Sequence, residues 1–180
     1  MTLNIGDKAV DYSLRNANEE IGGQSLTLEQ SAKENGLVVV FECNHCPYVV
    51  ASVDRMNRMS EYCKSNQIGF IGINSNDASV YANDSFEHMV KRARNGMPYA
   101  YLYDESQEIA HAYGAKRTPE FFLFDNNNTL VYRGRMDDSP RDPNQASTSE
   151  LKDAIDAMLD GSMPNVSETE SIGCSVKWKA

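Results

Sequence analysis

Two patterns of apolar residues alternate along this chain: short runs that are almost wholly apolar, and longer stretches in which apolar residues are regularly spaced. In short runs such as residues 37–41 and 68–73, nearly every position is apolar or glycine, which predicts buried strands. From residue 47 to residue 63, apolar positions instead recur every three or four residues. This spacing predicts a helix of about four turns with one buried face. The alternation of strands and helices predicts an α/β fold.

Turn and cap signals place further elements in the second half of the chain. Residues 105–113 have helical character, and Gly114 is the type of residue that commonly follows a helix C-terminus. Residues 121–124 and 129–132 are two strand-like runs on either side of a polar turn. This arrangement predicts an antiparallel hairpin.

The C-terminal region is predicted to hold one helix and a tail. Ser147 and Glu150 have the spacing of a capping box before a helix over residues 151–159. Residues 162–180 have no clear period. A chain of 180 residues has the length of one domain with a sizeable core. We therefore expect a single domain over residues 1–180, in which residues 162–180 form a C-terminal tail.

Composition and charge narrow the range of partners. Hydrophobic residues make up 41% and charged residues 24% of the chain, as in ordinary globular proteins. The net charge of -9 argues against binding to nucleic acid or to an anionic membrane. The longest apolar run, residues 37–41, is too short to span a bilayer. The N-terminus lacks the basic and apolar regions of a secretory signal, so we expect a cytoplasmic protein.

Two cysteines lie where the first buried strand gives way to a helix. Cys43 and Cys46 have Cys-x-x-Cys spacing, and Pro47 suits the first helical turn, where its missing N–H is not needed. A helix N-terminus favours a thiolate, and in a reducing compartment such a pair is more often catalytic or metal-binding than structural. We expect Cys43 to be the outer, attacking nucleophile and Cys46 to be the more buried, resolving thiol.

Neighbouring charges act on this pair in opposite directions. A protonated His45 would stabilise a thiolate, whereas the carboxylate of Glu42 would raise the thiol pKa, and the sequence leaves the net effect open. Metal binding is an alternative use of Cys43, His45 and Cys46. A structural zinc site needs four ligands, and the sequence has no second Cys-x-x-Cys and no His-x-x-x-His. We therefore expect no bound metal and no cofactor.

A proline precedes the apolar strand at residues 121–124. Pro119 follows Thr118, and X-Pro bonds adopt the cis form far more readily than other peptide bonds. We therefore predict a cis Thr118–Pro119 bond. A strand, a Cys-x-x-Cys-Pro turn, a helix, and then Thr-Pro before a hairpin together resemble the thioredoxin superfamily.

Several segments resemble a peroxiredoxin-like subfamily of that superfamily, related to alkyl hydroperoxide reductase and thiol-specific antioxidant proteins. They are residues 6–14, 41–47, 73–77, 118–125, 132–138 and 171–178. The resemblance implies a thioredoxin-like fold, with a central mixed β-sheet flanked by helices, an N-terminal strand extension and a C-terminal tail. It also implies a redox-active pair at Cys43 and Cys46, which faces the cis-proline. Thr118 would approach the disulfide and could hydrogen-bond a bound substrate chain.

The predicted function is that of a thiol-disulfide oxidoreductase. Its partners would be disulfides of proteins or small molecules, together with a thiol reductant system. Two alternatives stay open: an antioxidant thiol peroxidase that uses Cys46 or Cys43 to reduce a peroxide, and a redox sensor without turnover. We expect a monomer or a weak homodimer.

Further positions have two interpretations each. Cys174 could fold back as a third redox thiol, although a free cysteine in a docked tail is the simpler interpretation. Arg133 and Arg135, on either side of Gly134, could stabilise a thiolate or a peroxide oxygen. A surface salt bridge is the simpler interpretation of both. Cys63 lies on the apolar stripe of its helix and is expected in the core. Residues 74–77 follow the carboxyl end of a strand, where α/β proteins build sites, and have no assigned role.

Overall fold

The computed structural model describes residues 2–180, so residue 1 of the predicted domain lies outside it. The strands are β1 (Ser13–Asn16), β2 (Ser25–Thr27), β3 (Gly36–Phe41), β4 (Ile68–Asn74), β5 (Ala100–Tyr103), β6 (Arg117–Thr118), β7 (Glu120–Phe124), β8 (Leu130–Gly134) and β9 (Cys174–Ser175). The α-helices are α1 (Leu28–Ser31), α2 (Pro47–Ser65), α3 (Phe86–Arg94), α4 (Glu108–Tyr113) and α5 (Glu150–Leu159).

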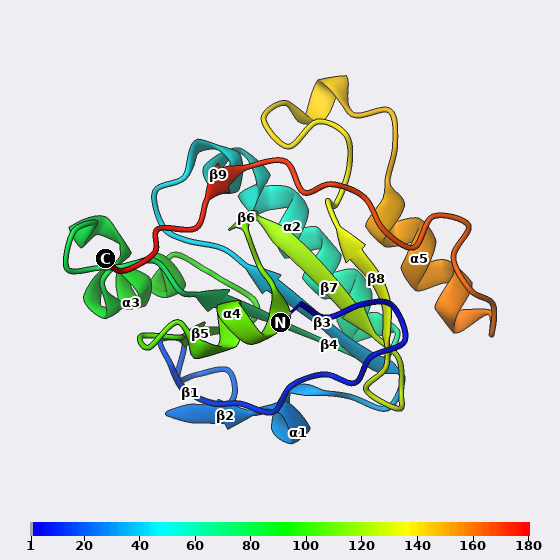
Figure 1. Ribbon diagram of the computed structural model, residues 1–180, viewed down its shortest axis with the longest axis horizontal. Coiled ribbons are helices and arrows are strands. Elements are labelled where there is room, and N and C mark those ends of the chain that lie inside the picture. Colours follow the sequence, from blue (N-terminus) through cyan, green and yellow to red (C-terminus); the bar gives the residue numbers. More distant parts are fainter. Residues whose placement is uncertain (1) are drawn as a thin grey trace.

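Seven of the strands form one mixed sheet in the order β2-β1-β5-β4-β3-β7-β8 (Figure 1). β3, β4 and β5 are parallel neighbours at its centre. β1 and β7 border this parallel core in antiparallel pairings, and β7 and β8 form the predicted hairpin. The remaining two strands, β6 and β9, make a separate antiparallel pair. The prediction of an α/β fold with a central mixed sheet flanked by helices is confirmed.

The core lies on both faces of the sheet because alternate residues of each central strand point to opposite sides. In β3, Val38 and Val40 pack in a cluster with α2, α3 and α5. Leu37, Val39 and Phe41 pack in a second cluster with α1 and α4. All six residues of β3 are buried, so the expectation of a strand buried on both faces is confirmed.

The helices follow the predicted pattern with shifted ends. α2 begins at Pro47 as predicted, and its 19 residues exceed the expected length. The expected helix over 105–113 begins only at Glu108, because Gln107 has left-handed backbone angles. Gly114 ends α4 in the left-handed conformation, with φ of 75°. The prediction that glycine closes this helix is confirmed, since glycine adopts that conformation without a steric penalty.

The predicted capping box before α5 is wrong. The helix begins at Glu150 itself, with Ser149 at the N-cap. The hydroxyl of Ser147 donates to the carboxylate of Asp138, and the Glu150 carboxylate accepts from Arg135. Both side chains therefore bond charged partners elsewhere, and the helix has no side-chain cap.

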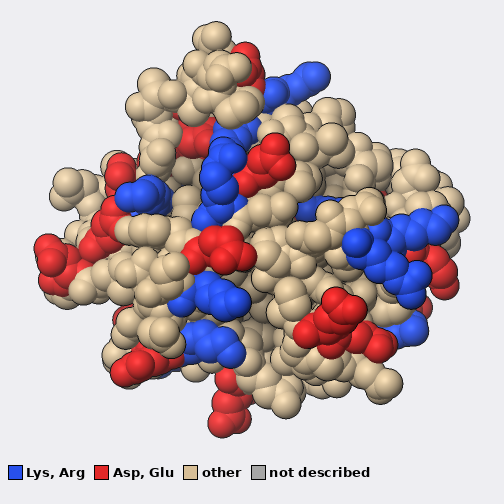
Figure 2. Space-filling model, turned by 180° about the vertical axis from the view of Figure 1, so that it is seen from behind, with Lys and Arg blue, Asp and Glu red and all other residues tan. Residues whose placement is uncertain are grey.

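The surface carries both signs of charge. Figure 2 shows acidic and basic side chains interspersed over the back of the molecule, where neither sign forms a continuous patch. This distribution differs from the single basic face that nucleic-acid binding uses. Among the described residues, no helix has both the length and the apolar character needed to cross a bilayer.

Candidate active site

The turn between β3 and α2 brings two thiols to the start of a helix. Cys46 is the N-cap of α2, and Pro47 is its first residue. β3 pairs with β7 in a register that sets Phe41 opposite Glu120. This pairing brings the peptide just before β7 beside the turn. The prediction of a cis Thr118–Pro119 bond is confirmed.

Thr118 contacts both sulfurs. Its hydroxyl lies 3.6 Å from the Sγ of Cys43. Its carbonyl oxygen lies 3.4 Å from the Sγ of Cys46, which donates to it when protonated. The structure therefore brings together the residues that the sequence singled out at two distant positions of the chain.

The expected difference in exposure between the two cysteines is wrong. Cys43 and Cys46 are each only 1% exposed. The reason is that the C-terminal tail passes over the site, where β9 pairs with β6 and sets Cys174 opposite Thr118. Cys174 is half-buried, and all four cysteines of the described residues are free thiols.

The two thiols have opposite pKa shifts. A hydrogen bond from the Cys43 thiol lowers the pKa of Cys46 to about 4, against the effect of burial. Hydrogen bonds from the thiol and the N–H of Cys174, and from the N–H of Val49 in α2, contribute to this lowering. The same contact with Cys46, together with burial and the charge of Asp84, raises the pKa of Cys43. The sulfur that gains from the helix N-terminus is thus that of Cys46, not Cys43 as the sequence predicts.

A buried carboxylate missed by the sequence analysis organises the turn. Asp84 is fully buried and accepts a hydrogen bond of 2.8 Å from the N–H of Asn44. Its other oxygen lies 2.7 Å from Nδ1 of His45 and accepts from Asn76 at 2.9 Å. His45 therefore pairs with Asp84, and one of its ring nitrogens also lies within 4.8 Å of the sulfur of Cys43. The sequence around Asp84 carries no motif that marks it.

The other acidic neighbour, Glu42, is neutralised. Its buried carboxylate pairs with Arg92 at 2.5 Å and accepts from the hydroxyl of Tyr99 at 2.8 Å. Arg92 also donates to the carbonyl of Cys43 at 3.1 Å. The expectation that Glu42 raises the thiol pKa is therefore replaced by the effect of Asp84.

One group of donor atoms could hold a metal ion. Cys43, His45 and Asp84 each place a ligand atom within 4.8 Å of the others. Two of these three donors, His45 and Asp84, already pair directly. A closed structural zinc site uses four ligands, and this group provides only three.

The remaining candidates have distinct surroundings. Arg135 pairs with Glu150 at 2.8 Å. Arg133 does not lie on the surface as expected: it is 7% exposed and pairs with the buried Glu120 at 2.9 Å. Cys63 is fully buried in α2, which confirms its expected place in the core.

The 74–77 loop, which the sequence left without a role, supports the site. Its four residues are buried. The amide of Asn74 donates to the carbonyl of Asp84, and the amide of Asn76 donates to the Asp84 carboxylate. The loop thereby fixes the position of the carboxylate that acts on Cys43.

The fold and the site define a thioredoxin-like protein with a Cys-x-x-Cys pair beside a cis-proline. The sequence matches the Redoxin family over residues 5–154, and the chain belongs to that family. No curated protein sequence matches the chain.

Solved structures extend this result. The chain is similar to an uncharacterized conserved protein from Geobacillus kaustophilus, with 39% identity, a TM-score of 0.89, and coverage of 98% of this chain and 93% of the other. A hypothetical protein from Sinorhizobium meliloti 1021 has 34% identity, a TM-score of 0.89, and coverage of 100% and 97%. Peroxidoxin BcpB from Mycobacterium tuberculosis shares the fold at 16% identity and a TM-score of 0.60, with coverage of 88% and 93%. Membership of the Redoxin family supports a thiol-based redox function, and the solved structures support the fold.

Proposed function

We propose that the protein is a thiol-disulfide oxidoreductase in which Cys43 and Cys46 alternate between dithiol and disulfide. The observation that carries the proposal is the contact between the buried thiols of Cys43 and Cys46, whose pKa values shift in opposite directions. The pKa of Cys46 lies well below the usual range of a thiol. A structural cysteine gains nothing from such a shift, whereas disulfide exchange requires a thiolate.

The shifts favour Cys46 as the sulfur that starts the reaction, in place of the Cys43 expected from the sequence. The Cys46 thiolate attacks one sulfur of a disulfide, and the other sulfur leaves as a thiolate and takes up a proton. Cys43 then loses its proton and attacks Cys46, which forms the Cys43–Cys46 disulfide and releases the second thiol. The protein loses two electrons and the substrate gains them. A thiol reductant restores the dithiol.

Single-turnover reaction with oxidised glutathione tests the proposal. Reduced protein is mixed with the reagent, quenched in acid, alkylated and mapped by mass spectrometry. We expect a Cys43–Cys46 disulfide that forms much faster than free cysteine reacts, and no acceleration in Cys46→Ser. The matched control Cys63→Ala, altered in the same helix but away from the site, should react like the parent. A parent protein that reacts no faster than free cysteine would overturn the proposal.

A second candidate, a thiol peroxidase, is favoured by the burial of both sulfurs, because hydrogen peroxide is smaller than any disulfide. The Cys46 thiolate would take one peroxide oxygen to become a sulfenic acid and release hydroxide. Cys43 would then condense with it to form the disulfide and water. Stopped-flow mixing with hydrogen peroxide distinguishes the two candidate functions. A rate constant like that of a free thiol would reject the thiol peroxidase.

A further inference from the structure

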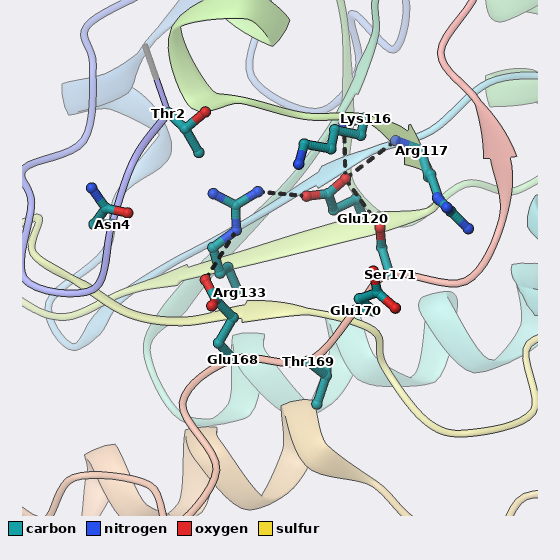
Figure 3. A pocket seen from close by; sticks show the side chains of 10 residues that line it. All are labelled: Thr2, Asn4, Lys116, Arg117, Glu120, Arg133, Glu168, Thr169, Glu170 and Ser171. Carbon is teal, nitrogen blue, oxygen red and sulfur yellow. Dashed lines mark hydrogen bonds and ion pairs between the residues drawn. The ribbon is translucent and has the colours of Figure 1, made fainter.

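The C-terminal tail is fastened to the molecule on both sides of the candidate site. In Figure 1 it runs from α5 back across the sheet, through β9, to the far side of the molecule near α3. Its first anchor is β8, where the N–H of Arg133 donates to Ser167 and the N–H of Thr169 donates to Arg133, each at 3.1 Å. Figure 3 shows this region, a polar groove of about 420 Å³ where Arg133 lies between Glu120 and Glu168.

The middle of the tail lies directly on the cis-proline peptide. β9 pairs with β6 so that Cys174 is opposite Thr118, and the N–H of Val176 donates to the carbonyl of Lys116 at 2.9 Å. A Cβ at Gly173 would overlap the carbonyl oxygen of Thr118. Only glycine allows so close an approach, so the sequence is adapted to this docked arrangement.

The end of the tail is held by the 74–77 loop and α4. The N–H of Asp77 and the amide of Gln107 both donate to the carbonyl of Lys177 at 2.9 Å. The indole of Trp178 stacks on His111 with ring centroids 4.2 Å apart. Since anchors lie on both sides of it, Cys174 is held in place over the site.

Cys174 lies beside the buried Cys43–Cys46 pair and is the most exposed of these three cysteines. It pairs with Thr118, whose carbonyl oxygen lies 3.4 Å from the sulfur of Cys46, and it packs against the cluster that contains Cys43 and Cys46. Cys43 and Cys46 are each 1% exposed, whereas Cys174 is half-buried. While the tail is docked, a thiol reductant therefore reaches Cys174 more readily than it reaches a Cys43–Cys46 disulfide.

We propose that Cys174 is a third redox thiol, which passes the disulfide from the buried pair to a thiol reductant in solution. The inference rests on the proposed function of Cys43 and Cys46. The sulfur of Cys174 attacks Cys46 in the Cys43–Cys46 disulfide, so that a Cys46–Cys174 bond forms and the Cys43–Cys46 bond breaks. The electron pair leaves on Cys43, which takes up the proton that Cys174 gives up.

The reductant then completes the reaction. Its first thiolate attacks the sulfur of Cys174, and Cys46 leaves as a thiolate. Its second thiol attacks the mixed disulfide, which frees Cys174 as a thiol and oxidises the reductant to a disulfide. Thiols of low pKa leave faster, so the low pKa of Cys46 favours attack at Cys174.

Cys174 is also suited to act only after the pair is oxidised. Burial, together with the hydrogen bond to Cys46 and the charge of Cys46, raises the pKa of Cys174 to about 11. When Cys46 is joined to Cys43 its charge is gone, so burial still raises the pKa of Cys174 while the charges of Lys177 and Arg141 lower it. Cys174 is therefore held as a thiol while the pair is reduced and becomes a better nucleophile when reduction is needed.

Two experiments on the full-length protein test the relay. In the first, reduced Cys43→Ser is treated with oxidised glutathione, quenched in acid and mapped by mass spectrometry. We expect a Cys46–Cys174 disulfide, with Cys63 recovered as an alkylated thiol. Glutathione that stays on Cys46 would overturn the relay, because Cys174 would then not reach Cys46. An unmodified chain would instead contradict the proposed function, because Cys46 would then not attack a disulfide.

In the second, protein carrying the Cys43–Cys46 disulfide is reduced with glutathione, and the rates of parent, Cys174→Ser and Gly173→Ala are compared. We expect both variants to be slower by about tenfold or more, since one loses the thiol and the other moves it away from Cys46. The control Cys63→Ala should match the parent.

The outcomes separate the two proposals. If Cys174→Ser and Gly173→Ala are reduced as fast as the parent, or faster, the tail is only a cover and the relay is wrong. If the Cys43–Cys46 disulfide does not form in the parent with oxidised glutathione, the proposed function fails as well.

Discussion

Replacing Cys43 by alanine should raise the pKa of Cys46 by the loss of one hydrogen bond. The thiol of Cys43 is the largest of the influences that lower the pKa of Cys46 from 9.0 to about 4. At pH 7, a group with a pKa of about 4 is a thiolate by about 1000 to 1, whereas a pKa of about 9 leaves about one thiolate per hundred chains. Alanine cannot donate, so the titration midpoint of Cys46 should move upward by more than about one unit.

The ultraviolet absorbance of the thiolate, recorded on reduced protein as a function of pH, measures this effect. The parent should carry close to one thiolate per chain at neutral pH, and Cys46→Ser should carry almost none. Cys63→Ala is the matched control, because burial raises the pKa of Cys63 to about 12 and keeps that thiol silent at neutral pH. A parent with less than about a tenth of a thiolate per chain at pH 7, or an unchanged midpoint in Cys43→Ala, would refute the reasoning.

Two further predictions concern stability. The lowered pKa of Cys46 means that the unfolded chain binds a proton between about pH 4 and 9 that the folded protein does not, so stability should rise with pH there. The free energy of urea unfolding is measured for the parent and for Cys46→Ser from pH 5 to 8. The difference between them should grow by up to about 1.4 kcal/mol per pH unit. A difference that does not change with pH would contradict the assignment of the low pKa to Cys46. Arg133→Ala should cost about 3–5 kcal/mol because it leaves the buried carboxylate of Glu120 unpaired. Arg135→Ala, at a pair whose arginine is 28% exposed, should cost less than about 1 kcal/mol, and equal losses would argue against a role for burial.

The main part of the fold could be predicted because it depends on local patterns. The continuous apolar run of β3 and the helical spacing after Pro47 each reflect burial within one segment. Pro47 and the Thr118–Pro119 peptide are marked by a residue whose backbone behaviour is fixed by its own covalent structure. The places where prediction was wrong, such as the capping box at Ser147, are those where a side chain bonds a charged group elsewhere in the chain.

The electrostatics of the site could not be predicted because tertiary contacts create them. Asp84 lies just before α3 and is held at the turn by the side chains of Asn74 and Asn76. Nothing near it in the sequence indicates a redox site. The tail pairs with β6 over only two residues, too few for any alternation of polar and apolar positions to appear. Gly173 is a visible signal in retrospect, although a single glycine has many structural uses.

The hydrogen bond between Cys43 and Cys46, burial and the position of Asp84 together make one pair of similar thiols asymmetric. A carboxylate beside a redox pair opposes thiolate formation, and here its charge acts on Cys43, whose pKa it raises. Keeping the proton on Cys43 makes that thiol a hydrogen-bond donor to Cys46, and the donor in turn stabilises the Cys46 thiolate. In the Cys46–Cys174 disulfide the lower-pKa thiol, Cys46, is also the better leaving group, so the same asymmetry directs an incoming thiol to Cys174. In this structure the partner that faces solvent is Cys174, so the buried acid and the docked tail favour the same order of exchange.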